Sequence, residues 1–367
     1  MAVNKFFSRL IYDLFKKYSV PEIKNNYDLG DPGKIIVIRQ HNQLGDLLAG
    51  IPLFRAIKEK YPKVHLTVIA SPSNYQGLSK NKFIDRLFIF DKKKLINPVY
   101  FNELHKLLKE KYDIAIVPVT VSISFTSNIL ARLANAKIRI GPQSLDGKEN
   151  KSAFFFDRRV KIDWRKFPDQ NIYERSLDLV RPFGITTRNF KPEISFDKDD
   201  LKKAADFISN KIKPDNGDIL IGMHIGAGKP QNRWSLYKFM DLIDRLNKTY
   251  PCKIYITGSV NDNEEISFIK KKLEIHVAYF LDHSISQIAA LISKSDLFIS
   301  NDTGIMHVAG ATNVPQVSIF GPTNPFQWAP IGENKIFVRK SDLIDDVSVE
   351  DVFEECIILL GKIPVVN

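Results

Sequence analysis

The chain has 367 residues, too many for a single ordinary core, and suits two domains of about 150–200 residues each. Hydrophobic residues make up 44% and charged residues 26%, which excludes a largely disordered protein. No apolar run approaches the roughly 20 residues of a membrane-spanning helix. The only cysteines, Cys252 and Cys356, are too few for a disulfide framework or a cysteine metal cluster.

The net charge of +11 is distributed unevenly. Residues 1–195 hold 34 Lys and Arg against 19 Asp and Glu, whereas residues 196–367 hold 19 against 23. A basic half beside an acidic one favours an anionic partner for the first half: nucleic acid, a membrane surface or an acidic glycan. Simple solvation of these side chains explains the surplus equally well. Because no recognition motif accompanies the charge, we expect no nucleic-acid binding.

The first segment, residues 1–33, is predicted to be a basic amphipathic helix followed by a linker. Apolar residues from Phe7 to Tyr18 recur at helical spacing, with lysine and arginine between them. Such a helix either lies on a membrane or covers a groove of its own protein. Because the segment lacks the pattern of a secretory signal, we expect a cytoplasmic protein, with peripheral contact to the inner membrane under the first alternative.

Residues 34–195 alternate between strand and helix patterns, which predicts a parallel sheet covered on both faces. Strands are expected at 34–39, 64–70, 86–90, 113–119 and 137–141, and helices at 46–61, 100–111, 127–136 and 168–183. A linker follows, in which Asp197 or Asp199 is expected to cap the next helix.

Residues 196–367 repeat the alternation. Strands are expected at 218–226, 253–258, 275–280, 296–300 and 315–321, and helices at 236–250, 264–272, 285–294, 304–312 and 349–360. The predicted fold class is therefore α/β, with two doubly wound domains in tandem, 34–195 and 196–367. Such an arrangement would place a cleft between the carboxyl ends of the two sheets.

Three segments after strands carry candidate chemistry. In the first, RQHNQLGDLLAGIP (39–52), Gly45 permits a tight turn. Asp46, at the helix N-cap or in the first turn, is then either a capping aspartate, which spacing alone favours, or a general base. The second, HIGAGKPQNRW (224–234), is no P-loop because Pro230 replaces the Ser or Thr that holds magnesium. Its Lys229 and Arg233 either reach a phosphate or are solvated.

The third segment, residues 296–330, has the most specific pattern. A strand ends at Asp302-Thr303-Gly304 and a helix begins at once, so free backbone amides would form an anion site. His307 lies one turn later on the side of Thr303. The next strand ends near Thr323, a second turn at the same sheet edge. Two adjacent turns of this kind predict a nucleotide diphosphate site.

Together, QLGD (43–46), the Arg-Trp pair (233–234), NDTGIMHVAGA (301–311) and FGPTNPFQWAP (320–330) resemble glycosyltransferase family 9, the bacterial lipopolysaccharide heptosyltransferases. The resemblance spans about residues 34–340. It implies a GT-B architecture, with two Rossmann-like domains facing across a cleft. The second domain would hold a nucleotide sugar, typically ADP-heptose. The first would bind a lipid-linked acceptor, often a Kdo-containing lipid A core.

The resemblance also assigns roles. It implies that Asp46 is the catalytic base and that Gln43 and Gly45 lie on the acceptor side. The donor-binding residues that it implies are Lys229, Arg233, Glu264, Asp302, Thr303, Gly304, His307 and Thr323. One position departs from the pattern: Asn232 stands where the family often has lysine, so Arg233 or Lys229 would have to supply the charge.

The predicted function is an inverting transfer of a sugar from a nucleotide donor to an anionic, lipid-linked glycan. Asp46 would deprotonate the acceptor hydroxyl as it attacks the anomeric carbon. No suitable DxD pair is present, so we expect neither an obligatory metal nor another cofactor. Two alternatives stay open: a different nucleotide sugar used for capsule, O-antigen or protein glycans, and a non-catalytic relative that acts as a binding subunit.

Overall fold

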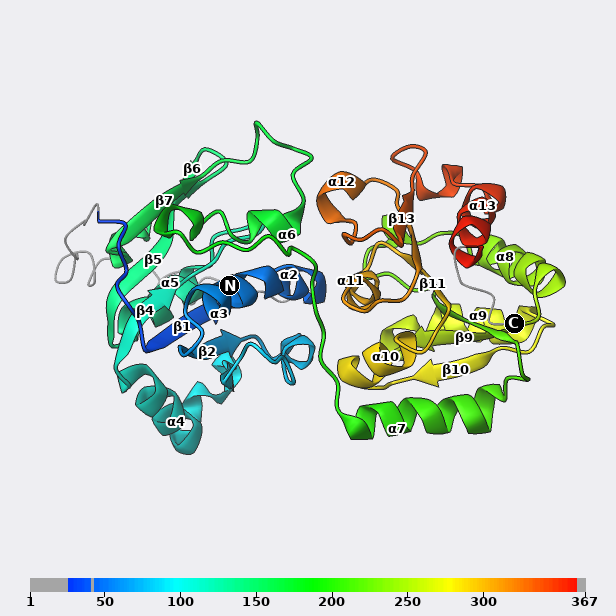
Figure 1. The fold of residues 1–367 in the computed structure, drawn as a ribbon, viewed down its shortest axis with the longest axis horizontal. Coiled ribbons are helices and arrows are strands. Elements are labelled where there is room, and N and C mark those ends of the chain that lie inside the picture. Colours follow the sequence, from blue (N-terminus) through cyan, green and yellow to red (C-terminus); the bar gives the residue numbers. More distant parts are fainter. Residues whose placement is uncertain (1–25, 41–42, 362–367) are drawn as a thin grey trace. The chain divides into compact units, whose positions relative to one another are not determined.

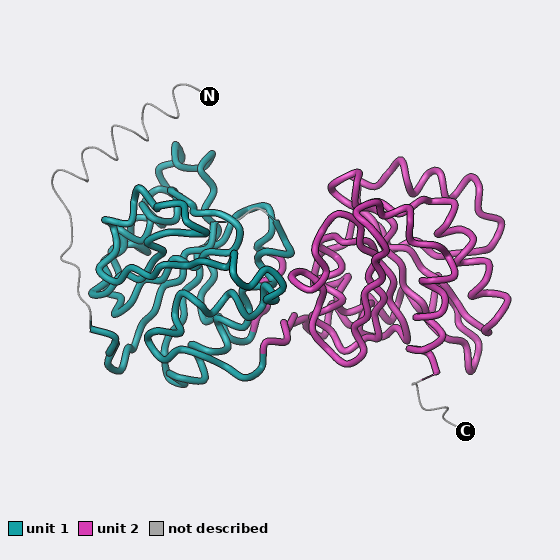
Figure 2. The backbone as a smooth tube through the Cα atoms, turned by 90° about the horizontal axis from the view of Figure 1, so that it is seen from above, with its two compact units in different colours: residues 1–75, 82–189 teal, residues 76–81, 190–367 magenta. Residues whose placement is uncertain are grey.

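A computed structural model describes residues 26–40 and 43–361, so the predicted amphipathic helix lies outside the described residues. The chain forms two compact units (Figure 2). Unit 1 comprises residues 1–75 and 82–189, and unit 2 comprises residues 76–81 and 190–367. In the part of the chain that the structure describes, no helix is both long and apolar enough to cross a membrane.

Unit 1 is built on a sheet that, among the described residues, has seven strands in the order β3-β2-β1-β4-β5-β6, with β7 paired to β5 (Figure 1). All pairs are parallel except β5 with β6. The strands are β1 (Lys34–Arg39), β2 (His65–Ala70), β3 (Arg86–Ile89), β4 (Tyr112–Ile116), β5 (Ala136–Leu145), β6 (Lys148–Glu149) and β7 (Arg158–Ile162). The five expected strands are confirmed, and β6 and β7 were not predicted.

The helices of unit 1 depart from prediction at two places. Among the described residues, the α-helices of this unit are α2 (Leu44–Leu48), α3 (Ile51–Lys60), α4 (Pro98–Lys109), α5 (Phe125–Leu133) and α6 (Ile172–Arg175). The single helix expected at 46–61 is divided because Pro52, at the second position of α3, has no N–H to continue the bonding from α2. The prediction of a helix over 168–183 is wrong: only α6 and a 3₁₀ turn at Arg181–Phe183 form there.

Unit 2 has a fully parallel sheet, with six strands among the described residues in the order β10-β9-β8-β11-β12-β13. This is the Rossmann order. The strands are β8 (Ile219–His224), β9 (Cys252–Gly258), β10 (Ala278–Leu281), β11 (Leu297–Asn301), β12 (Gln316–Ile319) and β13 (Lys335–Val338). The five expected strands are confirmed, and β13 was not predicted.

Helices cover both faces of this sheet, as predicted. They are α7 (Lys198–Phe207), α8 (Leu236–Thr249), α9 (Asn263–Lys272), α10 (Ile285–Ile292), α11 (Gly304–Gly310), α12 (Pro325–Trp328) and α13 (Val349–Leu360). Apolar residues of α8, α9 and α13 share one core with β8 and β9 (Figure 1). Phe207 of α7 meets Tyr255 and Phe280 on the opposite face. Of the two expected caps of α7, Asp197 is the N-cap residue.

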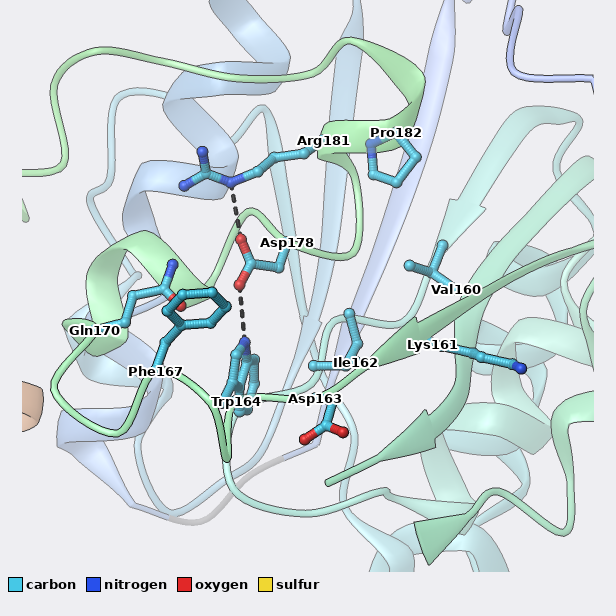
Figure 3. A pocket seen from close by; sticks show the side chains of 10 residues that line it. All are labelled: Val160, Lys161, Ile162, Asp163, Trp164, Phe167, Gln170, Asp178, Arg181 and Pro182. Carbon is cyan, nitrogen blue, oxygen red and sulfur yellow. Dashed lines mark hydrogen bonds and ion pairs between the residues drawn. The ribbon is translucent and has the colours of Figure 1, made fainter. Parts of the chain in front are cut away.

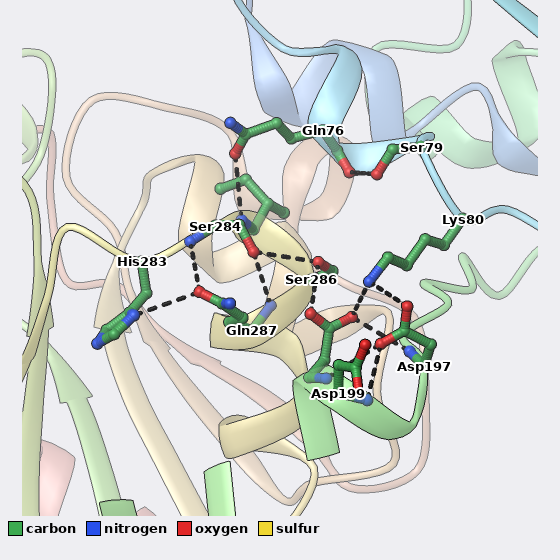
Figure 4. Close-up of polar contacts among 11 residues, drawn as sticks. Gln76, Ser79, Lys80, Asp197, Asp199, His283, Ser284, Ser286 and Gln287 are labelled. Atoms are coloured by element: carbon green, nitrogen blue, oxygen red, sulfur yellow. Dashed lines mark hydrogen bonds and ion pairs between the residues drawn. The ribbon is translucent and has the colours of Figure 1, made fainter. Parts of the chain in front are cut away.

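Residues 76–81 belong to unit 2 although they lie between β2 and β3 in sequence. Lys80 Nζ contacts Asp197 Oδ2 and Asp200 Oδ2, both at 2.6 Å (Figure 4). Ser286 donates to Asp200 Oδ1 at 3.2 Å, and Gln76 Oε1 accepts from the Ile285 amide at 3.3 Å. Polar contacts to α7 and α10 therefore hold this segment.

Strand order reverses beside the first strand of each sheet, between β1 and β4 and between β8 and β11. In open parallel sheets, ligands bind outside the carboxyl ends of strands at such a switch point. The segments that follow β1, β8 and β11 are the three that the sequence analysis singled out.

Candidate functional site

Asp302, directly after β11, is surrounded by a cluster of polar side chains in unit 2, which comprises Lys229, Asn232 and Thr323. Burial raises the pKa of this carboxyl, whereas a hydrogen bond from Thr323 and the positive charge of Lys229 act to lower it. Asn232 donates to Asp302 Oδ2 at 2.8 Å. The loops that follow β8, β11 and β12 thus meet at one carboxylate, and Lys229, Asp302 and Thr323 are brought together as expected of one site.

Asn232 is buried, with 5% of its surface exposed. Its amide nitrogen also donates to the Asp302 carbonyl at 3.2 Å. Its side-chain oxygen is buried and accepts no hydrogen bond within the described structure. Asn232 therefore orients Asp302.

Arg233 has partners of its own. Its guanidinium pairs with Glu265 Oε1 at 2.5 Å, and its Nε donates to the Ala227 carbonyl at 2.8 Å. Of the two cations expected at the donor, Lys229 is the one whose charge acts on Asp302. Glu264 is exposed in the first turn of α9. The buried partner Glu265 was missed, although it shares a helix face with Ile269, four residues on.

The loop that carries Lys229 and Asn232 is anchored by Trp234. The Trp234 backbone N–H donates to Asn301 Oδ1 at 3.1 Å, and its indole N–H donates to the Val347 carbonyl at 2.9 Å. Asn301 in turn donates to the Ile225 carbonyl at 2.8 Å. At Gly226, an added Cβ would lie 2.0 Å from Asp262 Oδ1, so a larger residue there would displace the Asp262 side chain. The loop is thus held at both ends.

Thr303 is the N-cap of α11, and its side chain makes no capping hydrogen bond. Gly304 begins the helix, and His307 lies buried one turn later. Burial lowers the pKa of His307 to about 4, and its ring meets that of Trp328 edge-on with centroids 6.2 Å apart. His307 is therefore neutral near pH 7.

Asp46 is buried in the first turn of α2, and Gln43 is the N-cap residue. Of the two positions expected for Asp46, the N-cap and the first turn, the structure places it in the first turn. The guanidinium of Arg39, at the end of β1, donates to the Asp46 carbonyl. Burial lowers the pKa of Arg39 to about 10, and the Asp46 charge raises it in part. Arg39 was not predicted as a site residue, although a charged residue that ends a buried strand is the signal that marks it.

Two further residues expected on the acceptor side occupy the same turn. Gly45 is buried in α2, and the Gln43 carbonyl accepts from Asn74 Nδ2 at 3.0 Å. Beneath them, a Cβ on Gly50 would lie 2.9 Å from the Arg39 guanidinium. Glycine at this position makes room for the buried arginine.

The carboxyl edge of the unit 1 sheet is hollowed by a cavity of about 380 Å³. Its lining comes from the segments that follow β1, β2 and β3 and from the start of α5: Gln40, Ser71, Pro72, Ser73, Phe90, Asp91, Lys92, Lys93, Ser124 and Thr126. The lining is polar and carries two lysines. These residues were not predicted as site residues, although their place after successive strands would have indicated them.

A shared metal site is absent from the described ranges, since no three His, Cys, Asp or Glu side chains there are grouped to hold an ion. That transfer proceeds without a metal stays a prediction.

Comparisons with known proteins identify the family of this chain. The sequence profile of glycosyltransferase family 9 (heptosyltransferase) matches residues 101–355. The chain is 26% identical to lipopolysaccharide heptosyltransferase 3 of Escherichia coli over 306 residues, covering 80% of this chain and 85% of that one.

Solved structures share the fold. The glycosyltransferase family 9 protein of Veillonella parvula superposes with a TM-score of 0.78 at 23% identity, over 90% of this chain and 98% of that one. For E. coli ADP-heptose lipopolysaccharide heptosyltransferase II, the TM-score is 0.71 at 20% identity, over 90% and 99%. The fold is α/β of the GT-B class, and the protein is a glycosyltransferase. With the profile covering most of its length, the chain belongs to glycosyltransferase family 9.

Proposed function

We propose that this protein transfers heptose from ADP-heptose to the core of a lipopolysaccharide or a related lipid-linked glycan, with inversion at the anomeric carbon. The relatives are named for lipopolysaccharide heptosyl transfer, and one solved neighbour is named for ADP-heptose. The observation that carries the proposal is the cluster of Lys229, Asn232, Thr323 and Asp302 at the switch point of a Rossmann-like sheet. Such a place binds nucleotides.

At the donor, the leaving diphosphate would be stabilised by Lys229, the hydroxyls of Thr303 and Thr323, and the backbone amides from Gly304 onward. Hydrogen-bond donors aimed at developing negative charge are worth roughly 3 kcal/mol each in catalysis. His307 would contribute a neutral N–H, and Asp302 would accept from hydroxyls of the sugar. Glu264 stays a proposal for the nucleoside.

At the acceptor, Asp46 would remove the proton of the attacking hydroxyl. The hydrogen bond from Arg39 to the Asp46 carbonyl holds the turn that carries the carboxylate, and this supports a positioning role for Arg39. The acceptor is proposed to be anionic and lipid-linked, in keeping with the basic first half of the chain. The protein would then work in the cytoplasm at the inner membrane.

A second candidate is a family member that uses another nucleotide sugar, and Asn232 at the usual lysine position favours it. Calorimetric titration with ADP, UDP, GDP and CMP, then with the matching sugar nucleotides, separates the two. Selective binding of ADP and ADP-heptose is the expected result. Preference for another base would move the assignment to the second candidate, and binding of none would support the non-catalytic alternative.

A further inference from the structure

One stretch of unit 1 exposes basic and apolar side chains next to one another. It covers the 3₁₀ helix Lys92–Ile96 and the first turn of α4 (Figure 1). Its exposed lysines are Lys92, Lys93 and Lys94. Its exposed large apolar side chains are Leu95, Ile96, Val99 and Phe101. We call these seven residues the basic apolar patch. Ile96 is 91% exposed and Val99 68%, so most of their apolar surface meets water.

The patch is held in place by contacts with the end of β3. The Tyr100 hydroxyl donates to the Ile89 carbonyl at 2.9 Å and accepts from the Asp91 amide at 2.7 Å. The Asp91 carboxylate accepts from the Lys93 amide at 2.9 Å and so caps the 3₁₀ helix. The core-facing side chains of α4 are leucines further along the helix. A fixed backbone therefore presents the apolar side chains of the patch to the surface, outside the core.

The lysines of the patch carry charge that no carboxylate compensates. Within the described residues, none of the three forms an ion pair with Asp or Glu. Other charged side chains of unit 1 bind one another. In the hollow beside β7, for example, Asp178 accepts from the Trp164 indole and pairs with Arg181, both at 2.8 Å (Figure 3). The patch is thus a place where unit 1 offers positive charge to a partner.

Exposed apolar side chains distinguish this run of lysines from another in the chain. Lys270–Lys272 forms a second run in the last turn of α9, all of whose residues are described, and no large apolar side chain of that helix is exposed. A run of lysines alone is usually a solvated surface. Apolar side chains gathered in one exposed place mark a surface that contacts a partner.

The charge of the patch selects the partner. In a two-fold dimer formed through this patch, each copy would face the same residues of the other, and the two sets of lysines would repel one another. The headgroups of an anionic bilayer pair with lysines, while apolar side chains enter the boundary between headgroups and acyl chains. Charge complementarity therefore favours a bilayer over a second copy of the chain.

We propose that the basic apolar patch is the surface by which unit 1 binds an anionic phospholipid bilayer. Ile96 and Val99 enter the headgroup boundary, and the lysines bind lipid phosphates. Lys92 and Lys93 also line the cavity at the carboxyl edge of the unit 1 sheet, so this cavity lies beside the bilayer surface. In that respect the inference rests on the proposed function, which takes the acceptor to be lipid-linked.

The test measures co-sedimentation of the full chain with vesicles of phosphatidylethanolamine and phosphatidylglycerol. Ile96→Ser/Val99→Ser should weaken binding to these vesicles roughly tenfold to hundredfold, because the apolar area that enters the lipid is lost. Lys92→Gln/Lys93→Gln/Lys94→Gln should weaken it roughly thirtyfold to hundredfold, since each lysine near an anionic surface contributes about fivefold. Vesicles of phosphatidylcholine alone should bind the unaltered protein much less tightly.

The matched control is Lys270→Gln/Lys271→Gln/Lys272→Gln, which removes the same charge from exposed positions of unit 2 and should bind as the unaltered protein does. An equal loss in this control would show that net charge alone drives binding and would overturn the patch. Unchanged binding in Ile96→Ser/Val99→Ser would overturn it as well. So would a dimer, seen by sedimentation equilibrium, that this double variant abolishes while vesicle binding is intact.

A transfer assay separates failure of the patch from failure of the proposed function. In Ile96→Ser/Val99→Ser, affinity for ADP and transfer to a deacylated, water-soluble acceptor should be unchanged, whereas transfer to the lipid acceptor in vesicles should fall. Vesicle binding needs no nucleotide sugar. If no sugar donor supports transfer, co-sedimentation therefore still decides whether the patch binds the bilayer.

Discussion

The proposed mechanism depends on the buried carboxylate of Asp46. It lies in the first turn of α2, three residues after the N-cap, with Arg39 bonded to its carbonyl. A positioned general base contributes about 10² to 10⁴ in rate. Asp46→Asn keeps the shape of the side chain and the Arg39 contact while it removes the basic oxygen.

We therefore expect Asp46→Asn to lower kcat by about 10² to 10⁴-fold with Kd for the donor unchanged. Steady-state kinetics and calorimetric titration with ADP measure the two quantities, and circular dichroism checks the fold. Turnover close to that of the unaltered enzyme would leave Asp46 with a structural role only.

Asn232 stands where the resemblance to the family predicts a lysine. Because its amide already donates to Asp302, a lysine there would bring a charge next to a carboxylate and to the proposed diphosphate. Asn232→Lys should bind ADP roughly threefold to tenfold more tightly at low ionic strength, with the gain reduced by salt. Asn232→Ala is the matched control and should weaken binding. If Asn232→Lys binds ADP less tightly than the unaltered protein does, Lys229 already supplies the positive charge at the diphosphate.

At the scale of elements, the segment 76–81 shows how unit 2 holds a piece of chain that is distant in sequence from the rest of the unit. Burial alone would lower the pKa of Lys80, but its hydrogen bonds to Asp197 and Asp200 raise it. The Asp200 side chain is only 4% exposed. Removing Lys80 leaves this carboxylate without its cation.

Lys80→Met should therefore lower the free energy of unfolding by about 1–2 kcal/mol, a value reduced because Lys80 and Asp197 are partly solvated. Urea denaturation followed by circular dichroism measures the change. Lys202→Met, at an exposed lysine on α7, is the control and should be close to neutral. Equal stability of the two variants would show that the ion pairs at Lys80 contribute nothing net.

Elements also show where local pattern fails. Pro168 and Pro182 bracket the stretch expected to be one helix, and within it Arg175 bonds to loop carbonyls while Trp164 and Arg181 share Asp178. Only a short helix, α6, forms. Side-chain contacts between residues three to fourteen positions apart outweighed helical periodicity there.

For the molecule as a whole, buried neutral histidine makes stability depend on pH. The pKa of His307 is lowered by burial to about 4, so the unfolded chain binds a proton near pH 6.5 that the folded chain does not. Stability should fall as pH drops from about 6.5 to about 4, with a slope of up to about 1.4 kcal/mol per pH unit from this group. His307→Gln removes the titrating ring.

Urea denaturation at intervals between pH 7 and pH 4 measures this dependence. The His307→Gln variant should show a shallower decline than the unaltered protein. Parallel declines in the two proteins would assign acid sensitivity to other groups.

Much of the architecture could be predicted from sequence because buried parallel strands and amphipathic helices have distinct periods, and the turns of QLGD and SNDTG follow their strands directly. The α/β class, the ten expected strands and the family follow from such local signals. The tertiary structure alone decided that Asn232 orients Asp302, that Arg233 pairs with Glu265, and that Arg39 lies buried beside Asp46. Each of those contacts joins two different segments that come together only when the chain packs. The pattern of residues along the sequence does not show which side chains from different segments will meet.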